Sequence, residues 1–448
     1  MKNTPHPGFT ASQSTQRLDG QSPCDHEIRA IRYLHIGGTD MRWALFSSAL
    51  ALMGCLMTPA RGDQPAVSHQ LQSLIDTYLE SRRDIEKISG VALHVDIGGH
   101  DPIDLYTGTN GRDGKPIDQE TLFQIGSNTK HFTSALVLKL EAEGLLNLDQ
   151  TVGDWLPRYP AWAKVTIRSL LNMTSDIPNY SETVPIAEAM SADLKHQFSQ
   201  SDLVAAVYDQ GLPIPTGYFY SNTNDVLAGL IIEAASHMSF GDALDAMLKP
   251  LHLKNTFYAD GPYPARVLSR LPVGIYANTD CTLYQPKPCS KTAWAGLVGK
   301  DVSHQNLSWA GPAGGMISNT TDLAHWVRAL FKGEIIPRKQ LDEMMSIVST
   351  KTGQPIPDVS ADDPAGFGLD LGRAYRPTLG GTYWFYQGTT FGYRAIFAYW
   401  PQYDLVITAM TNSQPQDADD RFAATVVGGA FQALQADGLT TPREGPPH

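Results

Sequence analysis

A serine and a lysine three residues apart, Ser127 and Lys130, are the side chains of this sequence best placed for covalent chemistry. A serine hydroxyl is a poor nucleophile at neutral pH unless a neighbouring group accepts its proton. The apolar spacing of residues 133–145 predicts a helix, and side chains three residues apart on a helix share a face. Ser127 would then lie near the N-terminus of that helix, where backbone N–H groups favour negative charge. The pair indicates an acyl-transfer nucleophile; the alternative is a capping serine beside a solvated lysine.

A tyrosine and an asparagine, Tyr220 and Asn222, make a second polar group further along the chain. They follow Pro215 and Gly217, which predict a turn. On a turn, a phenol and an amide at this spacing can point the same way and could serve acid–base chemistry and carbonyl binding. The alternative is ordinary turn chemistry with no catalytic role.

In this order, the two groups resemble motifs of the serine β-lactamase and penicillin-binding-protein superfamily, in its branch of class C β-lactamases, esterases and D-Ala-D-Ala carboxypeptidases. That branch carries Ser-x-x-Lys, then Tyr-x-Asn, then Lys/His-x-Gly on a strand near the C-terminus. The resemblance covers roughly residues 70–435 and includes the stretches 143–152, 166–178 and 314–324. It implies an α+β, β-lactamase/transpeptidase-like fold, in which an antiparallel sheet is flanked by helices and carries an inserted, mostly helical lobe.

The resemblance also implies a role for each residue. Ser127 would be the acylated nucleophile, and Lys130 would help to take its proton. Tyr220 would act as general base and later as acid to the leaving group. Asn222 would hold the substrate carbonyl, and backbone N–H groups of Ser127 and of a C-terminal strand residue would form the oxyanion hole. The sequence leaves the division of proton transfer between Lys130 and Tyr220 open.

The third motif has two candidate positions. A literal Lys-Thr-Gly occupies 351–353, but the residues after it have the composition of a loop. The resemblance instead places the motif at Tyr386-Gln387-Gly388, because Gly388 and the glycine four residues later match the family's Gly-x-x-x-Gly-Phe/Tyr spacing. These three residues would then bind substrate, and Thr389 would supply the oxyanion-hole N–H.

Tyr386 is a departure from the family that bears on the substrate. In β-lactamases and carboxypeptidases, the Lys or His at this position helps to bind the substrate's carboxylate, and a charge-assisted hydrogen bond is about twice as strong as a neutral one. Arg394 could replace that cation from the next strand, or could be a surface residue of the strand. Esterase-like members also lack the cation. We therefore expect an exported serine hydrolase that cleaves an ester or amide through a Ser127 acyl-enzyme, with an esterase-like preference. The alternatives are a β-lactamase, a D-Ala-D-Ala carboxypeptidase or D-aminopeptidase, and a non-catalytic penicillin-binding-like scaffold.

Charge and composition limit the classes of binding partner and cofactor that we expect. The chain has 448 residues and a formal net charge of -12, with no long basic run, so nucleic acid and anionic membrane surfaces are not expected partners. The sequence shows no Cys/His cluster at zinc spacing and no Gly-rich phosphate loop, and we expect neither a metal nor another cofactor. The expected partner is a small ester or amide, or a peptidoglycan-like substrate, and no obligatory protein partner is inferred.

The N-terminal region predicts export. Residues 41–62 contain a positive start, a short apolar run and small residues for cleavage, which is typical of a signal peptide. Residues 1–40 are a polar extension, and we expect translation to start at Met41. Cleavage would give a periplasmic or secreted protein, while Cys55 also permits a lipoprotein. A buried N-terminal helix is the remaining alternative.

Export would expose the cysteines to an oxidising compartment. Cys24 and Cys55 would be removed, or Cys55 would be lipidated. Cys281 and Cys289 remain in a polar, Pro-containing loop, where they form either a local disulfide or two free thiols.

The elements that must position these residues follow from periodicity. Residues 66–88 have helical spacing, 91–97 alternate as a strand, and 103–106 can pair back as a hairpin. The middle of the chain is mostly helical, 321–333 form a further helix, and the end returns to strands at 383–386, 394–400 and 405–411 before a helix over 417–436. This order predicts a hydrolase domain over 66–438. Its α/β lobe would comprise about 66–130 and 290–438, and its helical lobe about 131–289.

Overall fold

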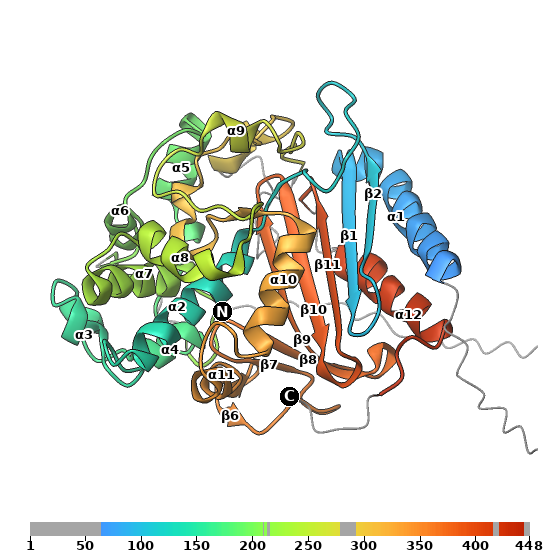
Figure 1. The fold of residues 1–448 in the computed structure, drawn as a ribbon. Helices are drawn as coiled ribbons and strands as arrows, with labels where there is room; N and C mark the ends of the chain where they lie inside the picture. The colour runs from blue at the N-terminus through green and yellow to red at the C-terminus, as the bar shows by residue number, and fades with distance from the viewer. Residues whose placement is uncertain (1–63, 209, 213–215, 278–292, 415–420, 443–448) are drawn as a thin grey trace, which may run out of the picture. The chain divides into compact units, whose positions relative to one another are not determined.

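The computed structural model describes residues 64–208, 210–212, 216–277, 293–414 and 421–442. They belong to a compact unit, residues 60–448, built around an antiparallel sheet of nine strands (Figure 1). The predicted α+β class, with an antiparallel sheet flanked by helices, is confirmed. Within the described ranges, each helix is too short or too polar to cross a membrane.

The sheet brings the first and last described strands together. Its strand order is β2-β1-β11-β10-β9-β8-β7-β5-β6, and Val91 of β1 lies opposite Thr411 of β11. The strands are β1 (Gly90–Ile97), β2 (Ile103–Gly108), β5 (Ile347–Ser349), β6 (Pro355–Ile356), β7 (Ala365–Phe367), β8 (Gly372–Arg376), β9 (Gly381–Thr390), β10 (Tyr393–Trp400) and β11 (Leu405–Thr411). A separate short pair joins β3 (Phe123–Gln124) to β4 (Ile317–Ser318).

Helices cover both faces of this sheet. One face shares its core with α1 (Gln64–Glu86) and with α12 (Gly428–Ala436), which follows a π-helical turn at Ala423–Val427 (Figure 1). The other face packs against α10 (Thr320–Phe331). Alternation along β1 explains the two cores, because successive side chains of a strand point to opposite faces.

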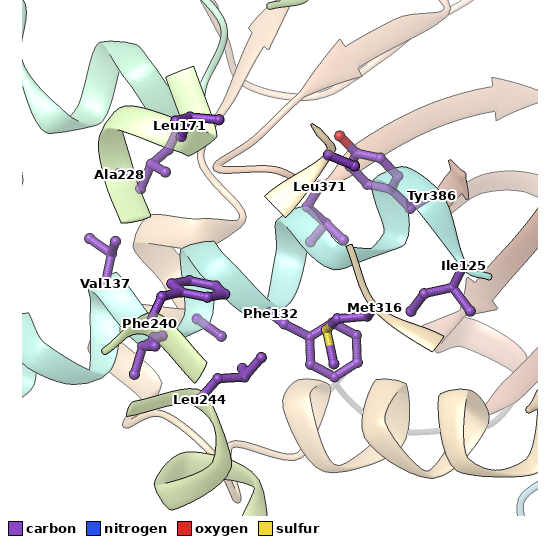
Figure 2. Packing of buried hydrophobic residues seen from close by; sticks show 14 of the residues in the cluster. Ile125, Phe132, Val137, Leu171, Ala228, Phe240, Leu244, Met316, Leu371 and Tyr386 are labelled. Atoms are coloured by element: carbon purple, nitrogen blue, oxygen red, sulfur yellow. The ribbon is translucent and has the colours of Figure 1, made fainter. Parts of the chain in front are cut away.

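The remaining helices gather around two largely buried ones, α2 (Thr129–Ala142) and α7 (Asn222–Ser236). Figure 2 shows apolar side chains meeting around α2; Phe132 and Val137 of this helix belong to the same buried cluster as Phe240 and Leu244. The other helices are α3 (Val152–Trp155), α4 (Ile167–Leu171), α5 (Val184–Ala192), α6 (Gln200–Ala205), α8 (Phe240–Leu248), α9 (Ala265–Leu268) and α11 (Arg338–Met344).

Two element boundaries near the motifs differ from the sequence prediction. α2 starts at Thr129, ahead of the predicted 133, and follows a 3-10 turn, Gly126–Asn128, that contains Ser127. β9 spans ten residues, where the residue pattern predicts a strand over 383–386 and the resemblance extends it through the motif at 386–388. Gly388 has low strand propensity and interrupts the pattern in the second half of β9, which pairs with β10.

Candidate active site

Two glycines bring the Ser127 turn into backbone contact with β9. Gly126 has a φ of +52°, and a Cβ on it would lie 2.5 Å from the Thr389 nitrogen. A Cβ on Gly388 would lie 1.8 Å from the Ile125 carbonyl oxygen, so only glycine fits there. Ser127 and Thr389 consequently line one groove, and their backbone N–H groups are the pair that the resemblance assigns to the oxyanion hole.

Lys130 is fully buried next to this turn and is surrounded by oxygen acceptors. Its Nζ donates hydrogen bonds to Asn222 Oδ1 at 2.7 Å and to the Ala313 carbonyl oxygen at 2.5 Å, and lies 3.6 Å from Asp225 Oδ2. The same Nζ lies 5.1 Å from the centre of the Tyr220 ring, within cation–π range. The structure therefore brings Tyr220 and Asn222 together at the side-chain nitrogen of Lys130.

A chain of hydrogen bonds fixes the orientation of Asn222. The Ser181 hydroxyl donates to Asn179 Oδ1 at 3.0 Å, so its oxygen is left to accept from Asn222 Nδ2 at 2.9 Å. Asn179 Oδ1 also accepts the backbone N–H of Asn222 at 3.1 Å. The amide oxygen of Asn222 must then face Lys130, which makes Asn222 a positioning residue for Lys130 as well as a residue of the groove.

Tyr220 interacts with the Ser127 hydroxyl from the turn before α7. Burial raises the pKa of the Tyr220 phenol well above its usual value, and hydrogen bonding with Ser127 opposes part of that rise. The negative charge of Asp225 raises the pKa further. Tyr220 is thus a neutral phenol at ordinary pH that interacts with the Ser127 hydroxyl.

The Tyr220→Phe variant should lose about 10²–10⁴-fold in kcat, the range for removing a positioned acid–base group. The variant keeps the ring that packs against Lys130 and removes only the hydroxyl, so the fold should persist. The matched control is Tyr208→Phe, whose hydroxyl accepts a hydrogen bond from the Ala161 N–H at 3.2 Å in the helical part of the molecule. Steady-state kinetics of both variants check this prediction, and an unchanged kcat in Tyr220→Phe would contradict it.

Tyr386 lies buried on β9, between other aromatic rings. Its ring centre is 5.9 Å from those of both His131 and Phe367, and its hydroxyl interacts with that of Tyr220. Burial raises the pKa of the Tyr386 phenol well above its usual value, so this position provides no charge. Gln387 follows on the strand and, by alternation, projects to the other face.

The literal Lys-Thr-Gly sequence lies away from the groove, as the loop composition predicts. It forms the turn between β5 and β6, where the Lys351 side chain is 56% exposed and its Nζ lies 3.8 Å from Asp363 Oδ1. Lys351 does not line the groove, so it cannot take the place of the missing cation.

Arg394 does not reach the groove either, and both sequence interpretations of it are wrong. The side chain is fully buried on the α1 side of the sheet, where it forms an ion pair with Glu86. It also donates hydrogen bonds to Ser413 Oγ at 2.7 Å and Tyr78 Oη at 3.1 Å. A strand residue faces one side or the other depending on register, and the sequence alone did not show that Arg394 faces away from Ser127.

The groove beside Ser127 is narrow, aromatic and uncharged. It is bordered by Tyr180 and Trp309, and the Tyr180 hydroxyl donates to the Trp309 carbonyl at 2.7 Å. The described residues that line it all carry neutral side chains: Ser127, Tyr180, Asn222, Trp309, Ala310, Ala313, Gly314, Thr389 and Thr390.

Two buried acids near Lys130, Asp225 and Asp370, have no part in the sequence prediction. Asp225 lies three residues after Asn222, in the first turn of α7, and Asp370 follows β7 in a left-handed conformation with a φ of 55°. The signal that could have revealed them is an isolated acid within an apolar stretch, because charged groups are rarely buried unless they are paired.

Some predicted features lie outside the described residues. These are Cys281 and Cys289, the predicted signal peptide at 41–62 and the residues before it. Within the described ranges, no three His, Cys, Asp or Glu side chains come together as a metal site would require.

Comparison with known families matches residues 72–430 to a family described as Beta-lactamase. Among curated proteins, penicillin-binding protein 4* of Bacillus subtilis is 28% identical over 256 residues, which are 54% of this chain and 52% of the relative. A β-lactamase of Providencia stuartii is 27% identical over 190 residues, 42% of this chain and 47% of the relative. The chain thus spans about half the length of these curated relatives.

Solved structures share the fold over a larger part of the chain. A D-stereospecific amidohydrolase from Streptomyces sp. is 26% identical with a TM-score of 0.61, over 82% of this chain and 99% of that one. D-amino acid amidase from Ochrobactrum anthropi is 22% identical with a TM-score of 0.68, over 83% of this chain and 99% of that one. The second likeness bears on the fold alone and supports the predicted β-lactamase/transpeptidase-like architecture.

Proposed function

Because the chain belongs to the Beta-lactamase family of serine hydrolases, we propose that it cleaves esters or amides without a free carboxylate, through an acyl-enzyme on Ser127 and with a preference for esters. The observation that carries this proposal is the uncharged groove. The sequence resemblance gives Tyr386, a neutral phenol, the position of the family's cation, and the described lining residues offer no charge to a carboxylate.

In the proposed mechanism, Ser127 Oγ attacks the substrate carbonyl carbon, and the backbone N–H groups of Ser127 and Thr389 stabilise the oxyanion. Tyr220 receives the Ser127 proton while its own proton passes to the leaving group, so the neutral phenol is regenerated. The carbon–leaving-group bond then breaks and leaves an acyl-enzyme. Water hydrolyses that ester by the reverse transfer and restores Ser127. Lys130 stabilises the negative charge that develops beside it.

Two esters with the same leaving group test the substrate class. Nitrophenyl acetate and the mono-nitrophenyl ester of succinic acid differ in the succinate's extra carbons and its carboxylate. We expect kcat/KM to be about tenfold or more higher for the acetate, because burying an unpaired carboxylate costs free energy. A chromogenic cephalosporin, which carries a carboxylate, should be turned over poorly. Efficient cephalosporin hydrolysis, or a preference for the succinate, would contradict the proposal, and Ser127→Ala reports the background rate.

Hydrolysis of D-amino acid amides is a second candidate, favoured by the likeness to the Streptomyces amidohydrolase at 26% identity. D- and L-phenylalanine amide, added to the same panel, distinguish the two candidates. Turnover of the D-amide above that of the esters would favour this amidase activity.

A further inference from the structure

The strongest unexplained feature near the site is the carboxyl pair of Asp225 and Asp370. Both side chains are buried, with relative exposures of 1% and 0%. In the described part of the chain, neither carboxyl oxygen of Asp370 accepts a hydrogen bond from an N–H group or a hydroxyl, and Lys130 Nζ lies 3.6 Å from Asp225 Oδ2. Two ionised carboxylates could not persist in this setting, because buried like charges repel and each requires hydrogen bonds.

Backbone hydrogen bonds fix the position of Asp370, whose side chain interacts with that of Asp225. The Asp370 N–H donates to the Leu171 carbonyl at 2.9 Å, and the preceding carbonyl, of Leu369, accepts from the Ser134 hydroxyl at 3.0 Å. Ser134 lies one turn after Lys130 on α2, so this helix both carries Lys130 and holds the backbone next to Asp370. These hydrogen bonds therefore fix the position of Asp370 in the core.

We propose that Asp225 and Asp370 share one proton and act as a single negative charge that holds Lys130 as an ammonium ion. The charges then balance, with one shared proton, one remaining negative charge and one ammonium in a closed site. An ammonium suits the acceptors around Nζ, Asn222 Oδ1 and the Ala313 carbonyl, because neither of them can donate a hydrogen bond. Lys130 has no lone pair in this state, so it acts through its charge and does not serve as the base for Ser127.

The pKa shifts agree with this geometry and show which acid keeps the proton. Burial raises the pKa of both carboxyls. The positive charge of Lys130 and the hydrogen bond with Asp370 offset part of the rise at Asp225, whereas the charge of Asp225 and the same hydrogen bond raise the pKa of Asp370. The other titratable groups that face the pair, Tyr220 and Tyr386, are neutral phenols with raised pKa values. Asp370 is thus the donor and Asp225 the carboxylate.

Two isosteric variants should differ in effect. In Asp370→Asn, an amide N–H replaces the shared proton and the negative charge of Asp225 survives, so kcat/KM should stay within about threefold of wild type. In Asp225→Asn, Lys130 loses its counter-charge and its anchor, so kcat/KM should fall about 10²-fold, as for a misplaced catalytic group. The rate of Asp225→Asn should also decline at a lower alkaline pH than that of wild type. Equal impairment of two folded variants, with unchanged pH profiles, would overturn the proposal.

Infrared spectroscopy of the full chain without substrate provides a second readout. The wild-type minus Asp370→Asn difference spectrum at neutral pH should contain a protonated carboxyl band that shifts in D₂O, and its absence would overturn the proposal. If Asp225→Asn fails to fold, this spectrum and the kinetics of Asp370→Asn still test whether the two acids share a proton. The role of the pair rests on the proposed Ser127 chemistry, but the band does not require turnover. Failure of hydrolysis and failure of proton sharing are therefore distinguishable.

Stability gives a third readout, with a definite sign. The folded pair binds a proton that the unfolded chain releases above about pH 4. Its contribution to stability is fully present below that pH and is lost as the pH rises through the raised pKa of the folded pair. Urea denaturation at a series of pH values measures this decline in the free energy of unfolding. The decline should be present in wild type and absent in Asp370→Asn, and an identical decline in the variant would contradict proton sharing.

Discussion

The Ser127→Ala variant should lose about 10⁴-fold or more in kcat while remaining folded, because removal of the nucleophile abolishes the covalent route. The side chain is small and lies at the groove, so its removal opens no sizeable cavity. Incubation of wild type with a serine-reactive phosphonate should add one adduct mass, and the variant should add none. Kinetics and intact mass measure the two effects independently.

The matched control for that variant is Ser236→Ala. The Ser236 hydroxyl donates to the Ile232 carbonyl at 2.7 Å, within its own helix, and takes no part in the groove. The control should keep wild-type turnover and accept the phosphonate. Labelling of Ser127→Ala at the wild-type rate would identify a different nucleophile, and absence of labelling in the wild type would favour a non-catalytic protein that retains the fold.

The Arg394→Met variant should lower the free energy of unfolding by about 3–5 kcal/mol, because it leaves the buried Glu86 without its main partner. The contacts of Glu86 with Arg82 Nε at 2.6 Å and Ser413 Oγ at 2.7 Å remain and place the expected loss toward the lower end. Urea denaturation measures the change. Under conditions where the variant is folded, kcat/KM should be unchanged, since Arg394 lies on the face of the sheet away from the groove.

A double variant, Glu86→Leu with Arg394→Met, provides the control for this prediction. Replacing both members of a buried ion pair with apolar groups is often near neutral, so the double variant should be more stable than Arg394→Met alone. The exposed pair of Arg338 and Asp342 on α11 offers a further comparison, and Arg338→Met should cause little change. A loss in Arg394→Met no larger than that in Arg338→Met would show that the buried pair contributes nothing to stability.

The sequence predicted the strands whose pattern is strong and the motifs whose order is specific. The segments 91–97, 394–400 and 405–411, predicted as strands, match β1, β10 and β11 closely, because these strands are rich in β-branched and aromatic residues. The structure also groups Ser127 and Lys130 with the Tyr-x-Asn motif, as expected from motif order.

The rest of the site depends on contacts that no local pattern encodes. Asp225 and Asp370 lie on separate elements, and only the packed fold brings the two carboxyls together beside Lys130. As an arginine, Arg394 could supply a cation to the site, but the register of β10 points its side chain toward Glu86. Propensity and spacing report on neighbours along the chain, whereas these features arise from neighbours in space.

The pairing of β1 with β11 also sets the order in which the enzyme can assemble. Strands so distant in sequence pair only after a large loss of loop entropy, so such contacts form late and slowly. Ser127 and Lys130 are close in sequence and are synthesised early, whereas the Thr389 N–H arrives on β9, within the sheet that β11 completes. We therefore expect a nascent chain to contain the proposed nucleophile long before the proposed oxyanion hole, and to become active only after the final strand has been synthesised.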